Sequence, residues 1–221
     1  MVVAFFTRDS IYETEKNRLL RSAQRLGLAV DAEPIESTGS WVRNASMKPS
    51  VLVAMRRKHA GPMLYVDVDA VFHRDPWPAL AALDCDIAAY YEPQGHLLSG
   101  TLFINHTPAA TALLQAWAQA CAENPDEWDQ LVLERLLDSD AARAEPRYRL
   151  ARLPVAYCWI FDKTDNAPCD RSTSSICRPA GKPRNASACS AGRSARSGAG
   201  GTGCARSSGS CSNEGARQAT A

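Results

Sequence analysis

Short apolar runs of strand length alternate with helical patterns through residues 1–166, and this order constrains the fold more than any other feature of the chain. Strands that alternate with helices are typical of α/β domains, in which helices cover a largely parallel sheet. We therefore predict one α/β domain over residues 1–166, with a mostly parallel sheet flanked by helices. The predicted strands are Val2–Phe6, Met63–Val66, Ile87–Tyr91 and Leu98–Ile104, the last interrupted by Ser99-Gly100.

The predicted helices begin and end at residues that commonly bound helices. Gly27 follows the first helix, Pro49 stands in the first turn of the second, and Thr107-Pro108 precede another. Apolar residues at helical spacing support the longer ones. The predicted helices are Glu13–Leu26, a segment from Pro49 through Val51–Met55, Ala79–Leu83, a segment from Pro108 with Leu113, Leu114, Trp117 and Cys121 on one face, and Asp129–Leu137.

The composition of the chain changes abruptly after Phe161. No aromatic residue follows it, and residues 167–221 consist mainly of Ser, Gly, Ala, Arg and Cys. Such a segment cannot bury enough apolar surface to offset the entropy that is lost on ordering. We therefore predict a disordered, low-complexity tail over residues 167–221.

Charge and cysteine usage exclude several classes of partner. The formal net charge is +1, so no overall field favours nucleic acid or an anionic membrane. The eight cysteines form no CxxC pair and no zinc pattern. The run Met1–Phe6 lacks the basic start of a signal peptide, and no apolar run approaches the roughly 18 residues of a membrane-spanning helix. We therefore expect a cytoplasmic protein with no nucleic-acid partner and no membrane span.

Two carboxylates, Asp67 and Asp69, directly follow the predicted strand Met63–Val66. If the backbone stayed extended there, both side chains would share a face and could reach one cation. Mg²⁺ and Mn²⁺ bind carboxylate oxygens and complete their coordination with water and phosphate oxygens. Ligands of α/β sheets gather beyond the carboxyl ends of the strands. The pattern predicts a divalent-metal site, and the alternative is a strand-ending turn with two exposed acids.

A second Asp-x-Asp segment, Asp84 to Asp86, precedes the strand Ile87–Tyr91 instead of following it. It therefore stands at the opposite edge of the predicted sheet from the ligand edge. We interpret this second pair as a solvated turn.

Four short segments stand in a characteristic order along the chain: Phe6–Tyr12, then Trp41 with Lys48-Pro49, then Leu64–Val71, and finally Leu98–Leu102 followed by Trp128-Asp129-Gln130. Together they resemble the nucleotide-diphospho-sugar transferase family and, more distantly, the glycogenin-like glycosyltransferases. The likeness covers most of residues 2–162. It implies a GT-A (Rossmann-like) fold, Mn²⁺ or Mg²⁺ as the metal, a nucleotide-sugar donor with UDP-sugars favoured, and an acceptor that the sequence does not identify.

By this resemblance Thr7, Asp9 and Tyr12 form the nucleoside pocket, where an aromatic face stacks on the base. Lys48 matches the lysine that such enzymes direct at the diphosphate, and a compact ammonium suits phosphate. The alternatives are a helix-capping turn with Tyr12 packed on the core, and an ordinary surface lysine.

The same resemblance places Ser99, Gly100 and Thr101 beside the donor sugar, where a glycine lets the backbone approach closely. Asp129 and Gln130 match the pair that contacts the transferred sugar from the start of a helix, and we assign them as the catalytic pair. The alternatives are a plain β-bulge and an acidic residue that complements the helix dipole.

The family pattern is not matched after Asp129-Gln130. Glycogenin-like enzymes take a third metal ligand from a later histidine, whereas all four histidines here precede Asp129. The codons for Ser175–Gly181, in a shifted frame, can encode His-Leu-Gln-Ala-Ser-Arg, a stretch similar to that of the relatives. We therefore hypothesise a frameshift shortly before Cys169 and expect weak metal binding and feeble turnover. Among the histidines, His96 lies close to Ser99-Gly100 and is the one to test as an acceptor-side contact.

Two other functions fit the sequence. A haloacid-dehalogenase-like, Mg-dependent phosphatase also has a strand followed by DxDx[TV], as in Asp67–Val71, with the first aspartate as nucleophile. That motif usually lies near the N-terminus, whereas here a βα unit and a second helix come first. The other alternative is a truncated fold that binds nucleotide, or nothing, without activity.

Overall fold

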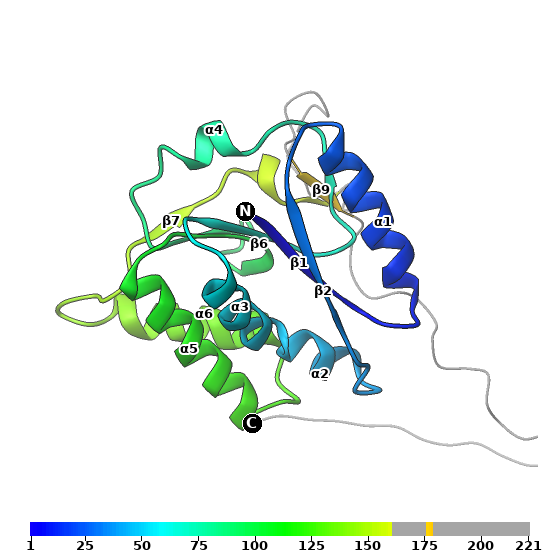
Figure 1. Ribbon diagram of the computed structural model, residues 1–221. Coiled ribbons are helices and arrows are strands. Elements are labelled where there is room, and N and C mark those ends of the chain that lie inside the picture. Colours follow the sequence, from blue (N-terminus) through cyan, green and yellow to red (C-terminus); the bar gives the residue numbers. More distant parts are fainter. Residues whose placement is uncertain (161–175, 179–221) are drawn as a thin grey trace, which may run out of the picture. The chain divides into compact units, whose positions relative to one another are not determined.

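The computed structural model describes residues 1–160 and the backbone of residues 176–178, all within one compact unit, Met1–Lys182. Six strands form the main sheet, in the order β2-β1-β3-β6-β5-β7 (Figure 1). Of the predicted disordered tail the structure describes only Ile176–Arg178, whose backbone forms strand β9. The rest of the tail and the proposed frameshift lie outside the described residues, and the boundary at residue 166 stays a prediction. The six strands are β1 (Val2–Thr7), β2 (Val30–Ile35), β3 (Met63–Val66), β5 (Ile87–Tyr91), β6 (Leu97–Ile104) and β7 (Leu150–Arg152).

Strand β6 is the one reversed strand of the main sheet. Strand β1 pairs in parallel with β2 and β3, and β5 pairs in parallel with β7. Strand β6 lies between β3 and β5 and is antiparallel to both. The predicted mostly parallel α/β sheet is therefore confirmed. Because β6 runs the other way, its first residues lie at the edge where β1 and β3 end.

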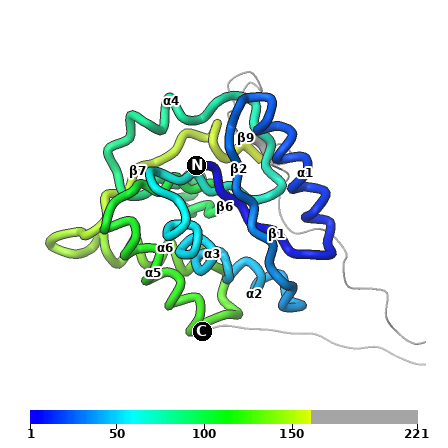
Figure 2. Tube along the Cα trace, viewed as in Figure 1, coloured from blue at the N-terminus to red at the C-terminus, as the bar shows by residue number. Residues whose placement is uncertain are grey.

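Helices cover both faces of the sheet. On one face α3 (Lys48–Lys58), α5 (Pro108–Glu123) and α6 (Asp129–Ala141) pack on Met63 and Tyr65 of β3. On the other face α1 (Ile11–Gln24) and α4 (Trp77–Leu80) pack on Leu64 and Val66. This alternation follows from the two-residue period of a strand. Figure 2 shows α3, α5 and α6 together, away from α1 and α4.

Side-chain caps fix the starts of two helices that the sequence predicted. The hydroxyl of Ser10 accepts a hydrogen bond from Tyr12 N at 3.2 Å, so α1 begins at Ile11, before the predicted Glu13. The hydroxyl of Thr107 accepts one from Ala110 N at 3.1 Å, with Pro108 at the start of α5. Among the helices of the described residues, none combines the length and the apolar character needed to cross a bilayer.

Several short elements were not predicted. Strand β2 contains Pro34 and two charged positions, and it lies at the edge of the sheet, where a missing N–H donor is tolerated. A second small sheet has the order β4-β9-β8 and joins residues far apart in sequence. The other unpredicted elements are α2 (Trp41–Ser46), β4 (Val71–Phe72), β7 (Leu150–Arg152), a 3₁₀ turn (Val155–Tyr157), β8 (Trp159–Ile160) and β9 (Ile176–Arg178).

Candidate functional site

A cavity of about 470 Å³ lies at the edge where β1 and β3 end and β6 begins. It is the edge at which α/β sheets bind their ligands. The structure therefore brings together side chains that are up to about 120 positions apart in the sequence. Nine of the predicted site residues line this cavity: Thr7, Tyr12, Lys48, Asp67, Asp69, Ser99, Gly100, Asp129 and Gln130.

The segment that carries the two acids is a turn and not an extended strand. Strand β3 ends at Val66, and Ala70 N donates to the carbonyl of Asp67 at 3.0 Å to close the turn. Arg18 of α1 donates to the carbonyl of Asp69 at 3.2 Å. The prediction of extended geometry was therefore wrong, because the chain reverses direction directly after β3. Both carboxylates still line the same cavity.

Tyr65 orients the first of these acids. Its hydroxyl donates to Asp67 Oδ1 at 2.7 Å. Burial raises the pKa of Tyr65 well above its ordinary value, and the neighbouring charge of Asp67 raises it further. The phenol therefore stays protonated and remains a donor. The main chain is held as well, because Asp67 N donates to the carbonyl of Gly100 at 2.8 Å.

Lys48 is buried inside the site and is not a surface lysine. Its side chain extends from the first residue of α3, and the residue is only 5% exposed. The ammonium Nζ lies 2.9 Å from Ser99 Oγ, 2.9 Å from Asp129 Oδ2 and 3.6 Å from Asp67 Oδ1. A buried cation needs such partners to offset the loss of its hydration. Lys48 thus links the acid after β3 to the acid at the start of α6.

The start of β6 departs from regular pairing where it meets the cavity. Ala89 of β5 pairs with Leu102 and the next residue, Tyr90, pairs with Leu98, so residues 99–101 have no regular partner in β5. Ser99 Oγ donates to Asp129 Oδ2 at 2.9 Å, and Ser99 N donates to Gln130 Oε1 at 3.3 Å. Strand β6 and helix α6 are therefore joined at the cavity.

Two predicted site residues do not line the cavity. Thr101 is fully buried and pairs with Val66 of β3. Asp9 is exposed in the turn after β1, where its φ of 51° lies in the left-handed region. The geometry brings neither side chain to the wall of the cavity, whereas Thr7 and Tyr12, on either side of Asp9, do line it.

Several aromatic side chains also line the cavity. Trp41 and Trp128 meet edge to face, with ring centroids 5.7 Å apart, and Phe5 and Phe6 contribute from the end of β1. Burial raises the pKa of Tyr12, and Asp69 and Asp67 raise it further against the effect of a hydrogen bond from Trp41. The sequence analysis did not assign the phenylalanines, although their place at the end of a buried strand was a usable signal.

The second Asp-x-Asp segment lies before β5, at the opposite edge of the sheet. Asp86 is buried and accepts hydrogen bonds from Thr107 Oγ1 at 2.7 Å and from Arg149 N at 2.8 Å. Burial by itself would raise the pKa of Asp86, but these hydrogen bonds and the charge of Arg149 outweigh it and hold the pKa below its ordinary value. Asp84 is exposed, as predicted for a solvated turn, but the prediction was wrong for Asp86, because its carboxylate joins the residue before β7 to the start of α5.

The family model of the nucleotide-diphospho-sugar transferases matches residues 52–178, which is more than half of the chain and includes both acids after β3. The chain belongs to this family. A nucleotide-diphospho-sugar transferase is a glycosyltransferase, and the cavity at the ligand edge is its candidate active site. No curated protein sequence matches the chain.

Solved glycosyltransferases share the fold of this nucleotide-diphospho-sugar transferase. A glycosyltransferase involved in glycosylation of the major capsid of PBCV-1 superposes with a TM-score of 0.60 at 13% identity, over 82% of this chain and 95% of that one. The galactosyltransferase LgtC, crystallised with donor and acceptor sugar analogues, gives 0.53 at 13% identity, over 82% and 87%. GlyE of Streptococcus pneumoniae gives 0.50 at 17% identity, over 72% of this chain and 46% of that one. At these identities the likeness shows the fold.

The residues of the cavity fit a divalent cation that is shared with a diphosphate. Asp67 and Asp69 are hard oxygen donors on one turn, and Mg²⁺ commonly takes one or two carboxylates together with substrate phosphates. Within residues 1–160 no group of three or more His, Cys, Asp and Glu side chains could hold a metal by itself.

Proposed function

We propose that the chain transfers a sugar from a nucleotide-diphosphate donor, with UDP-sugars favoured, and that Asp67 and Asp69 hold Mn²⁺ or Mg²⁺ against the diphosphate. One observation carries this proposal. Asp67, Asp69 and the buried Lys48 meet in a single cavity that also has an aromatic wall. Charged groups and aromatic faces in one cavity are complementary to a nucleoside diphosphate.

The leaving diphosphate accumulates negative charge as the bond to the sugar breaks, and a bound cation neutralises that charge. Residues of this chain hold the proposed metal ligand and a second positive charge in place. Tyr65 fixes Asp67 through the 2.7 Å hydrogen bond, and Lys48 is held 3.6 Å from the same carboxylate. The ammonium of Lys48 therefore lies beside the proposed metal ligand, where its charge would stabilise a bound diphosphate.

The nucleoside is expected on the aromatic side of the cavity. Trp41 and Tyr12 offer aromatic faces for the base, and Thr7 offers a hydroxyl for its edge. This placement keeps the prediction for Thr7 and Tyr12. Asp9 stays a prediction that has no support from the geometry, because its side chain does not line the cavity.

The transferred sugar is expected between the start of β6 and the start of α6. Among the described residues, Asp129 Oδ1 is a buried oxygen without a hydrogen-bond partner, and Asp129 lines the cavity. Buried polar atoms are nearly always satisfied, so this oxygen is suited to accept a hydroxyl of the sugar. Gln130 and the backbone of Ser99-Gly100 line the same part of the cavity and complete the proposed sugar site.

Calorimetry with UDP and Mn²⁺ tests the donor site. We expect heat of binding that disappears when EDTA removes the metal and that is strongly reduced in Asp69→Asn. The matched control is Asp84→Asn, which changes an exposed acid of the other pair. Heat that is the same with and without Mn²⁺ would contradict the role of the metal.

A donor-hydrolysis screen with Mn²⁺ across UDP- and GDP-sugars identifies the nucleotide and tests turnover. It should be run on this chain and on a version with the corrected reading frame. Inactivity of both on every donor would count against transfer. Hydrolysis of p-nitrophenyl phosphate that is lost in Asp67→Asn would instead favour the phosphatase, and the absence of any UDP binding would favour the inactive fold.

A further inference from the structure

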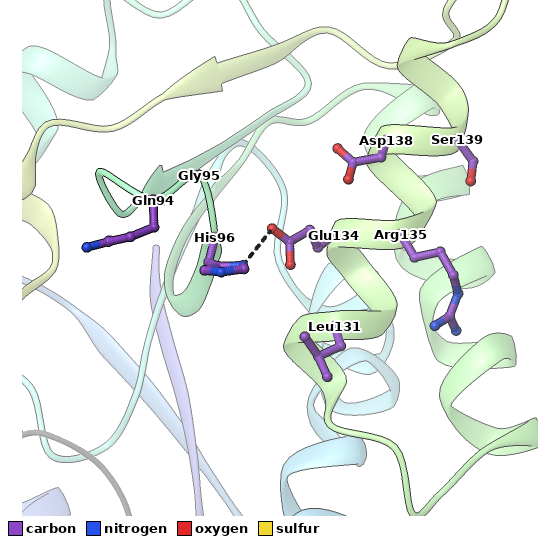
Figure 3. A pocket seen from close by; sticks show the side chains of 8 residues that line it. All are labelled: Gln94, Gly95, His96, Leu131, Glu134, Arg135, Asp138 and Ser139. Atoms are coloured by element: carbon purple, nitrogen blue, oxygen red, sulfur yellow. Dashed lines mark ion pairs between the residues drawn. The ribbon is translucent and has the colours of Figure 1, made fainter. Parts of the chain in front are cut away.

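A second cavity, of about 480 Å³, lies between the hairpin that joins β5 to β6 and one face of α6 (Figure 3). We call it the hairpin groove. Its walls are Gln94–His96 on the hairpin and, on α6, the exposed face that includes Leu131, Glu134 and Asp138. Figure 3 shows His96 directed across the gap at Glu134, and the nearest atoms of this pair are 3.9 Å apart.

The hairpin groove continues from the proposed sugar site along the same two elements. Leu97 N donates to Glu134 Oε1 at 3.0 Å, just as Ser99 N, two residues further along β6, donates to Gln130 Oε1. Glu134 comes one helical turn after Gln130, a rise of about 6 Å along the axis. A molecule that lies in the groove would therefore have one end next to the site of the transferred sugar.

The charges of the hairpin groove favour a neutral ligand over an anion. Arg135 directs its guanidinium at Glu127, with Nη2 2.9 Å from Oε2, so its charge is compensated. The acids Glu134 and Asp138 also line the groove, and the exposed His96 lies 3.9 Å from Glu134. A phosphate or carboxylate would be repelled by these two acids, whereas hydroxyl groups can donate to them.

Two further observations, on Tyr91 and on Leu131, also favour a ligand that has hydroxyl groups and an apolar face. Burial raises the pKa of Tyr91, on the adjoining strand, to about 12, and the next largest cause is the charge of Asp138. The hydroxyl of Tyr91 therefore stays protonated. Leu131, which lines the groove, is 45% exposed. Its side chain offers apolar surface for the C–H face of a sugar ring, next to acids that can bind its hydroxyls.

We propose that the hairpin groove binds the acceptor and that the acceptor is a neutral saccharide. This rests on the proposed function, since it takes the transferred sugar to lie at Asp129-Gln130. In the transfer, an acceptor hydroxyl oxygen forms a bond to the anomeric carbon. The bond from that carbon to the diphosphate oxygen breaks, its electron pair leaves with the diphosphate, and the hydroxyl proton passes to solvent.

Saturation-transfer NMR on the full chain tests the groove directly, without turnover. The probes are a panel of neutral mono- and disaccharides, with glucose 6-phosphate and N-acetylneuraminic acid as anionic comparisons. Leu131→Trp fills the groove from an exposed position, and the double variant Glu134→Gln, Asp138→Asn removes both charges. Glu145→Gln, at an exposed position in the segment after α6, is the matched control.

We expect signal from at least one neutral saccharide, no change in the control, and a loss of affinity of about tenfold or more in each groove variant, as expected for lost bonds to charged groups. The heat of UDP binding with Mn²⁺, measured on the same Leu131→Trp sample, shows that its donor site is folded. Absence of signal from every neutral saccharide, stronger signal from the anions, or full signal in Leu131→Trp would overturn the proposal. Absence of UDP heat with saccharide signal intact would overturn the donor site and support the groove.

Discussion

The two Asp-x-Asp segments of this chain have the same sequence pattern but lie at opposite edges of the sheet. Asp67 and Asp69 follow β3 and line a cavity, whereas Asp84 and Asp86 precede β5. Asp86 is buried and accepts hydrogen bonds from Thr107, before α5, and from Arg149, before β7. The side chain of Asp84 is 87% exposed and forms an ion pair with Arg149. The direction of the adjoining strand therefore decides whether such a pair can meet a ligand, because only one edge of the sheet collects ligands.

The largest expected effect is on stability, at Asp86. Asp86→Ala should lower the free energy of unfolding by about 2–4 kcal/mol, because Thr107 Oγ1 and Arg149 N lose their shared acceptor in a buried place. Urea denaturation measures the change. Asp84→Asn is the control and should stay within about 0.5 kcal/mol, as is usual at an exposed site. Equal effects at both positions would remove the contrast within the second pair.

Asp67→Asn should act on binding and leave the fold intact. The variant removes one proposed metal ligand while the asparagine oxygen can still accept the hydroxyl of Tyr65. We expect the dissociation constant for UDP with Mn²⁺ to rise about 100-fold, equivalent to about 2.7 kcal/mol. Calorimetry measures the affinity and urea denaturation checks the fold. A large loss of stability with normal UDP affinity would make the first pair resemble the second.

Tyr65→Phe sharpens the comparison, because it removes the group that positions Asp67 without changing either acid. The loss of one hydrogen bond to a carboxylate should weaken UDP binding about five- to tenfold in the presence of Mn²⁺. The Mn²⁺ concentration needed for half-maximal UDP binding should rise in the variant, whereas a purely structural role of Tyr65 predicts an unchanged midpoint. Titrations at several Mn²⁺ concentrations distinguish the two roles.

The smallest expected effect is a change in the pH dependence of stability. The pKa of Asp86 is held below its ordinary value of 3.8 in the folded chain, so the stabilisation is fully present above that value and is lost as the pH falls through the folded pKa. In Asp86→Asn this component is absent. Denaturation between about pH 5 and about pH 2.5 should therefore show a shallower fall than in the wild type. If stability falls with pH as steeply in the variant as in the wild type, the lowered pKa of Asp86 in the folded chain is contradicted.

The sequence predicted the elements that have strong apolar patterns and missed those that depend on tertiary context. Strands β1, β3, β5 and β6 and the longer helices are apolar enough to be recognised. Strand β2 contains two charged positions because it lies at an edge, and the pairing of β8 with β9 joins distant segments. The reversal of β6 was not predictable either, because hydrophobic periodicity is the same in both strand directions.

The structure brings most of the predicted site residues to one cavity, and their functional roles stay predictions. Lys48, Asp67 and Asp129 came from motif resemblance, and the structure places them around one cavity. The turn at Asp67–Ala70 and the burial of Asp86 arise from neighbours that a linear motif does not show. Thr101 and Asp9 were carried over with their segments, although one strand residue or one turn residue is enough to change the direction of a side chain.

The reversal of β6 also separates the proposed acceptor site from the proposed nucleotide-donor site. The hairpin from Glu92 to Leu97 leads into β6 at the same edge as the turn that carries Asp67 and Asp69. None of the hairpin residues lines the cavity proposed to bind the donor. With the proposed acceptor site in the hairpin groove, changes in the length or composition of this hairpin would alter which acceptor is glycosylated. The proposed nucleotide site would stay unchanged. Variation among related enzymes in the sugar chains that they extend would accordingly be concentrated in this one connection.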